Sequence, residues 1–174
     1  MSEPTQQYLH SILNYEPETG LFTWKVSRGS AKKGWIAGKS DKDGYVRIGM
    51  LRKTYPAHRL VWLFVHGRWP SELIDHINGI PDDNRLCNLR EASKSENGMN
   101  RKLGANNTSG HLGVIWSKHS SRWLVRVKVL GAVTDFGSYK DIELAALVAS
   151  EVREKYFGEF APSHLKTKSK GASQ

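Results

Sequence analysis

The chain has 174 residues, enough for one ordinary domain or two small ones, which excludes a large multidomain assembly. Its 26 Lys and Arg against 17 Asp and Glu leave a net charge of +9, typical of a protein that neutralises phosphates. The single cysteine excludes an internal disulfide and a cysteine-bound zinc site, and the longest apolar run, residues 60–65, is too short to span a bilayer. We therefore expect a soluble, cytoplasmic protein without a membrane partner.

The first hundred residues predict short helices and strands in mixed order. We expect helices at residues 6–13, 58–66 and 93–101, and strands at residues 21–26, 44–50, 53–55 and 73–76. Apolar and polar residues alternate in the two middle strands, which predicts a half-buried hairpin. In the third helix, Ser93 followed by Glu96 three residues later has the pattern of a helix N-cap.

The last third of the chain predicts a small two-layer α+β unit. Three strands are expected at residues 112–117, 123–130 and 133–139, followed by a helix over residues 141–156, where apolar residues recur at helical spacing. The middle strand alternates between two faces: Trp123, Val125, Val127 and Val129 on one, and Leu124, Arg126, Lys128 and Leu130 on the other. We expect the helix to cover the apolar face, with Trp116 also in the core.

A polar stretch over residues 101–110 predicts a boundary between two domains. We divide the chain into a first domain at 1–102, a linker at 103–110, a second domain at 111–163 and a basic flexible tail at 164–174. Up to Asn100 there are 14 basic and 11 acidic residues, and after it 12 and 6. The shorter second part therefore carries most of the excess positive charge.

The segment from Asp75 to Asn97 contains the residue types that hydrolysis of a phosphodiester requires. A neutral imidazole, here His76, has a proton affinity suited to deprotonating water near physiological pH. A hard cation such as Mg²⁺ takes oxygen ligands, which Asp75 and Asn97 can supply. Asp75 and His76 are neighbours on an extended segment, so both can serve one site only where the strand end bends.

This segment is similar to the HNH (His-Asn-His) homing endonuclease motif of the ββα-metal nucleases, in the variant that ends in Asn. The order DHxNG, DNR, NLR, SEN carries the resemblance, and TG-LFTWK and DGYVRI extend it upstream over roughly residues 8–102. The resemblance implies that Asp75 and Asn97 are metal ligands, that His76 is the general base and that Asn88 is the middle motif residue. We interpret Asn88 as a structural residue that bonds across the hairpin and holds His76 in place, rather than as a direct participant in the chemistry.

His58, Cys87 and the remaining histidines have simpler interpretations. His58, on the expected buried helix, is either a packed core histidine or a residue that supports the site or contacts phosphate. Cys87 is interpreted as a buried apolar residue without a redox task. The remaining histidines have no spacing that suggests a metal cage.

Residues 109–160 resemble the AP-two/ethylene-response-factor DNA-binding domain. The matching pieces are LGV, the WLVRVK strand, FGSY, the Ala-Ala helix and FG. The resemblance implies a three-stranded antiparallel sheet, packed on one helix, that enters the major groove of DNA. The DNA-binding residues we expect are Lys118, Arg122, Arg126, Lys128, Arg101 and Lys102. Because Ile115 and Ser117 stand where the plant domains have arginines, the plant target sequence does not transfer.

Together these features predict an α+β, two-domain, site-specific DNA endonuclease of the homing type. We expect it to use Mg²⁺ or Mn²⁺, to nick double-stranded DNA as a monomer, and to be phage-encoded and act in the cytoplasm of a bacterial host. The alternative is a catalytically inactive, sequence-specific DNA-binding regulator. An RNA-directed nuclease is less favoured, because neither half shows an exposed stacking surface of the RNA-binding kind.

Overall fold

The structure is a computed structural model that describes residues 3–162, and the chain divides into two compact units between Asn97 and Gly98. We call these the N-terminal unit and the C-terminal unit. The predicted basic tail, residues 164–174, lies outside the described residues. Among the described residues, no helix combines the length and apolar character needed to cross a membrane.

The N-terminal unit contains three small antiparallel sheets and three helices. In chain order its elements are α1 (Gln6–Ile12), β1 (Leu13–Glu16), β2 (Leu21–Trp24), β3 (Lys39–Ser40), β4 (Val46–Met50), β5 (Lys53–Pro56), α2 (Ala57–His66), β6 (Leu73–His76), the 3₁₀ turn η1 (Leu86–Asn88), β7 (Leu89–Ala92) and α3 (Lys94–Met99). The sheets are β1-β2, β3-β4-β5 and β6-β7. The last helix continues past the boundary between the units.

Local sequence explains why the N-terminal elements begin and end where they do. Thr5 caps α1, with its side chain accepting a hydrogen bond from the backbone N–H of Tyr8. The turn between β4 and β5 holds Leu51 and Arg52 at φ 52° and 60°, the left-handed values of a two-residue hairpin turn. Helix α2 ends at Gly67 in the left-handed conformation, where glycine carries no steric penalty.

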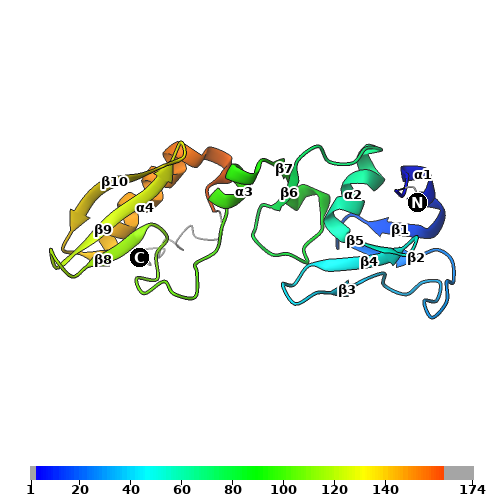
Figure 1. Cartoon of the computed structure of the whole chain (residues 1–174). Helices are drawn as coiled ribbons and strands as arrows, with labels where there is room; N and C mark the ends of the chain where they lie inside the picture. The colour runs from blue at the N-terminus through cyan, green and yellow to red at the C-terminus, as the bar shows by residue number, and fades with distance from the viewer. Residues whose placement is uncertain (1–2, 163–174) are drawn as a thin grey trace, which may run out of the picture. The chain divides into compact units, whose positions relative to one another are not determined.

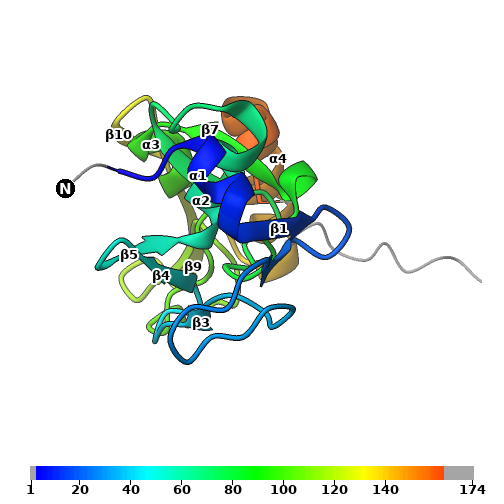
Figure 2. The same cartoon turned by 90° about the vertical axis from the view of Figure 1, so that its right-hand side faces the viewer.

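One hydrophobic core connects the helices and sheets of the N-terminal unit. Its fully buried side chains include Leu9 on α1, Ile48 on β4 and Leu60 and Val61 on α2. Helices α1 and α2 pack against each other, as Figure 2 shows. This core extends to Ile74 on β6 and Leu89 on β7, so it supports the strands that carry the candidate site.

The C-terminal unit is a three-stranded antiparallel sheet with one helix along one face (Figure 1). Its elements are β8 (Val114–Ser117), β9 (Arg122–Val129), β10 (Ala132–Tyr139), α4 (Ile142–Phe157) and η2 (Gly158–Phe160), and the sheet order is β10-β9-β8. Asp141 caps α4 by accepting hydrogen bonds from the N–H groups of Glu143 and Leu144 at 2.7 and 3.1 Å.

The helix covers the apolar face of this sheet because small residues line their contact. Ala145 and Ala149 of α4 are buried against Val125, Val127 and Val129 of β9, as the alternation in β9 predicts. Helix α4 was predicted over nearly the same residues.

Two burial predictions are wrong. Trp116 is 41% exposed, because α4 packs over Val114 and the valines of β9 and not over Trp116, whose ring contacts Trp123 with centroids 4.9 Å apart. Cys87 is exposed, because it occupies the outer side of η1 while Leu86 packs on the core and Asn88 is buried. Strands β1, β3 and β7 were not predicted from the sequence.

Candidate active site

The candidate site is built on the antiparallel pair β6-β7 and on the loop and helix that follow. In the register of this pair, Asp75 lies opposite Arg90, and His76 lies opposite Leu89. Asp75 and His76 are each only 5% exposed, so two ionisable neighbours are buried at the end of one strand. Buried ionisable groups need specific partners, and both residues have them.

Asp75 forms an ion pair with Arg90 across the two strands. Arg90 donates from Nε and Nη2 to the same carboxylate oxygen, Asp75 Oδ2, at 2.9 and 2.7 Å. Both side chains are largely buried, with 6% exposure for Asp75 and 13% for Arg90. This arrangement orients the carboxylate at the strand end and compensates its charge.

His76 is enclosed by an amide and two aromatic rings. Its Nε2 lies 3.2 Å from Oδ1 of Asn84. The His58 ring contacts it in a T-shaped arrangement with centroids 5.1 Å apart, and the Tyr45 ring lies at 5.9 Å. Burial lowers the pKa of His76 below its usual value of 6.5, and hydrogen bonding to Asn84 and the charge of Asp75 partly oppose this shift. The imidazole is therefore neutral, and able to accept a proton, at physiological pH.

His58 forms one wall of this enclosure from helix α2. Burial, together with the neighbouring His76, lowers the pKa of His58 to about 3. Its Nδ1 is buried and has no hydrogen-bond partner among residues 3–162, and its ring also contacts Tyr45. The burial of this ring favours the packed histidine over contact with phosphate, and its contact with His76 is compatible with support of the site.

Asn88 ties together the loop that joins β6 to β7. Its Oδ1 accepts from the N–H of Asn78 at 3.0 Å, and its Nδ2 donates to the Asn78 side chain at 3.0 Å and to the carbonyl of Asp83 at 2.8 Å. The same loop contains a salt bridge between Arg85 and Asp83, which lowers the pKa of Asp83 to about 2. These bonds hold together the loop whose Asn84 contacts His76.

Helix α3 places Asn97 one turn after Ser93, which forms a capping box with Glu96. Ser93 Oγ accepts from the N–H of Glu96 at 3.2 Å, while Glu96 Oε2 accepts from the N–H of Ser93 at 2.8 Å, as the sequence predicts. The N–H of Asn97 donates to the carbonyl of Ser93, and the residue is exposed.

The donor chemistry fits a hard divalent cation. Asp75 and Asn97 offer carboxylate and amide oxygens, which Mg²⁺ and Mn²⁺ prefer. Residues 3–162 contain no cluster of three or more His, Cys, Asp or Glu that could enclose a metal. A magnesium ion bound through one or two protein oxygens takes its other ligands from water and substrate phosphate.

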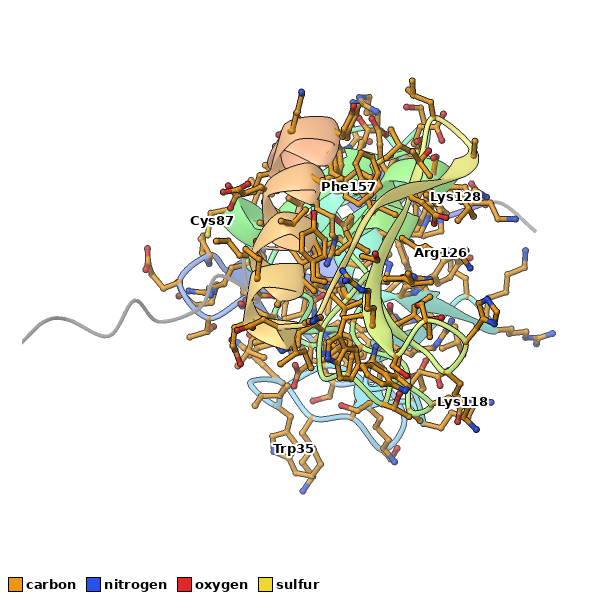
Figure 3. The ribbon with its side chains drawn as sticks, turned by 90° about the vertical axis from the view of Figure 1, so that its left-hand side faces the viewer. Trp35, Cys87, Lys118, Arg126, Lys128 and Phe157 are labelled. Carbon is orange, nitrogen blue, oxygen red and sulfur yellow. The ribbon has the colours of Figure 1, made fainter. Side chains whose placement is uncertain are left out.

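The cations of the C-terminal sheet lie on the face opposite α4. In Figure 3, Arg126 and Lys128 are on the sheet, away from the helix that carries Phe157. Arg126 donates to Asp135 of β10 at 2.6 and 3.2 Å, and this ion pair is exposed. Arg122 donates to the carbonyl of Ser138 at 3.4 Å. Lys118 is exposed, as are Arg101 and Lys102 outside the sheet.

Comparison with known proteins identifies the family of this chain. The family model described as HNH endonuclease matches residues 55–99, which run from β5 to α3. Protein 3.8 of Escherichia phage T7 is 38% identical over 119 residues, covering 64% of this chain and 98% of that protein. The chain belongs to the HNH endonuclease family.

A solved structure of DNA binding and cleavage by the HNH homing endonuclease I-HmuI is also similar. It is 28% identical to this HNH-family chain, with a TM-score of 0.41, and the match covers 56% of each chain. This chain therefore matches about half of the length of that solved chain.

The structure adds residues that sequence reasoning did not assign to the site of this HNH-family protein. Arg90 and Asn84 contact Asp75 and His76 directly, and Tyr45 contributes a ring. Arg90 could have been found only from the β6-β7 register, which requires recognising the short strand β7. Asn84 belongs to the DNR segment noted in the sequence, but nothing in its spacing indicates which side chain it meets.

Proposed function

We propose that this protein is a metal-dependent DNA endonuclease whose N-terminal unit is a ββα-metal nuclease module formed by β6, β7 and α3. The observation that carries the proposal is a buried imidazole of lowered pKa, His76, beside the buried carboxylate of Asp75, inside the segment that matches the HNH endonuclease model. A base and a hard metal ligand at adjacent positions suit hydrolysis of a phosphodiester.

In the proposed reaction, neutral His76 takes a proton from the attacking water. Asp75, oriented by Arg90, and Asn97 would hold Mg²⁺ or Mn²⁺. When bound, the cation supplies positive charge to the scissile phosphate and to the leaving oxygen. Asn88 keeps the loop that carries Asn84 folded. Because each chain has one such motif, we propose nicking by a monomer.

The C-terminal unit is proposed to locate the site on double-stranded DNA as an AP-two/ethylene-response-factor-like domain. Supporting this role, one face of its sheet is covered by α4 and the other presents Arg126 and Lys128 to solvent. Lys118 and Arg122 flank that face, and Arg101 and Lys102 precede the domain. The exposed Arg126–Asp135 pair can exchange its carboxylate for a DNA phosphate, because exposed ion pairs are weak.

The relationship to a phage protein supports a phage-encoded enzyme that acts in the host cell. A plasmid-nicking assay with and without Mg²⁺ tests the activity, and a mobility-shift assay on the same protein tests binding. Metal-dependent conversion of supercoiled to relaxed plasmid, lost in His76→Ala, is the expected result. DNA binding without nicking in Mg²⁺ or Mn²⁺ would instead favour the alternative, an inactive DNA-binding regulator.

A further inference from the structure

Asn84 is a buried amide whose oxygen faces the ring of His76, although it is not one of the motif residues. It is buried, with 2% exposure, and its Oδ1 lies 3.2 Å from His76 Nε2. A buried amide must satisfy its polar atoms within the protein, so the partners of Asn84 limit how the amide can be turned.

The other end of the amide fixes which atom faces the imidazole. Asn84 Nδ2 donates to the backbone carbonyl of Asp82 at 3.1 Å, and a carbonyl only accepts. Oδ1 is therefore the end that faces His76, and an amide oxygen only accepts as well. The hydrogen bond then requires a proton on Nε2, so in the neutral ring the basic lone pair is on Nδ1.

The backbone of Asn84 is anchored to a distant part of the chain. Its carbonyl accepts from the hydroxyl of Tyr15 on β1 at 2.9 Å, and the same hydroxyl accepts from the N–H of Leu86 at 3.0 Å. Gly20, at the turn between β1 and β2, packs so closely that a Cβ there would overlap the backbone nitrogen of Arg85. The hairpin β1-β2 thus holds the Asn84 segment in place through Tyr15 and the close packing at Gly20.

We propose that Asn84 is a positioning residue that fixes both the orientation and the tautomer of His76, and that the hairpin β1-β2 holds Asn84 in place through Tyr15. The inference rests on the proposed function for its catalytic consequence, because it assumes that His76 is the base. Asn84 does not touch the substrate in this scheme. It makes Nδ1, rather than Nε2, the atom that receives the proton from water.

The first test compares cleavage and binding in Asn84→Ala and Asn84→Asp. Asn84→Ala is expected to lower the single-turnover cleavage rate by about 10- to 100-fold while changing the Kd for DNA less than twofold, since no phosphate contact is lost. Asn84→Asp keeps an acceptor oxygen and should recover most of the rate. The exposed Asn106→Ala serves as the matched control. A folded Asn84→Ala protein that cleaves at the normal rate would overturn the proposal.

The second test needs no cleavage. Ring ¹⁵N chemical shifts of the metal-free full chain, assigned by the loss of signals in His76→Gln, report which nitrogen carries the proton. We expect a protonated Nε2 in the wild type and a mixture of tautomers in Asn84→Ala. A wild-type ring protonated on Nδ1, or a tautomer unchanged in Asn84→Ala, would refute the positioning role. If the wild type shows the expected tautomer but never cleaves DNA, the proposed function fails and the positioning role stands.

Discussion

Arg90 donates two hydrogen bonds to one oxygen of Asp75, across the β6-β7 pair and largely shielded from solvent. The proposed metal ligand is therefore also half of a buried ion pair. Removing one partner of such a pair is costly, because the other charge loses its compensation in a region of low dielectric constant. Substitutions of Asp75 consequently affect metal binding and folding together, and these effects must be measured separately.

Asp75→Ala is expected to lower the free energy of unfolding by about 3 to 5 kcal/mol, because Arg90 loses its buried carboxylate. Asp75→Asn keeps the shape and should cost less, while still weakening Mg²⁺ binding. Denaturant unfolding gives the first quantity and calorimetric Mg²⁺ titration of folded protein gives the second. Glu91 is on the same strand as Arg90 and forms an exposed ion pair with Arg68, so Glu91→Gln, which breaks that pair, is the control. Unchanged Mg²⁺ affinity in Asp75→Asn would contradict the ligand assignment.

His76→Ala is expected to reduce cleavage by about 10²- to 10⁴-fold, the usual consequence of removing a general base. DNA binding should change little, since the buried imidazole does not pair with phosphate. Mg²⁺ affinity should also stay near the wild-type value, which separates this variant from Asp75→Asn. Nicking kinetics, mobility shifts and metal titration measure the three quantities. Full activity in His76→Ala would mean that another group is the base.

Acid should destabilise the N-terminal unit partly through His58. Its pKa is about 3 in the folded protein, against 6.5 when unfolded, so below pH 6.5 the unfolded chain binds a proton that the folded chain does not. The free energy of unfolding then falls by about 1.4 kcal/mol per pH unit, or about 2 kcal/mol between pH 7 and 5. Urea unfolding at both pH values should show a smaller loss in His58→Leu. His119 is exposed, so His119→Gln is the control and should lose as much stability as the wild type. A loss in His58→Leu equal to that of the wild type would contradict the prediction.

The sequence predicted those features that repeat along the chain or form a local motif. Alternation in β9 placed Val125 inside and Arg126 outside, and the pair Ser93 and Glu96 located the start of α3. The contacts of the candidate site are of another kind. Tyr15 meets the carbonyl of Asn84 across 69 positions, a contact that no periodicity encodes. The exposure of Trp116 depends on how far α4 extends over the sheet. The alternation of residues along a strand does not predict that extent.

The outward sheet face makes a prediction about salt dependence. Arg126→Ala combined with Lys128→Ala should weaken DNA binding and lower the slope of log affinity against log salt by up to about 2, as two phosphate contacts are lost. Asp135→Asn should act in the opposite direction, because it removes the carboxylate that holds Arg126. Lys155→Ala, an exposed cation on α4, is the control. If neither affinity nor site preference changes, this face is not the DNA surface.

Truncation after Gly104 should separate cutting from site recognition. The hydrophobic core of the N-terminal unit lies between Leu9 and Leu89, and the candidate catalytic residues end at Asn97. The fragment of residues 1–104 should therefore fold and retain metal-dependent nicking. It loses ten basic and six acidic residues, including every cation of the sheet, so binding should be weaker.

Cleavage by this fragment at the preferred site should be slower and partly restored by more enzyme or less salt. Discrimination against other sequences should fall, because contacts to base edges are lost together with contacts to phosphates. Mapping the cut sites of full-length protein and fragment at matched turnover measures this loss, and a circular dichroism melt verifies folding. An unchanged site preference would assign recognition to the N-terminal unit, whereas an unfolded fragment would mean that the two units depend on each other for stability.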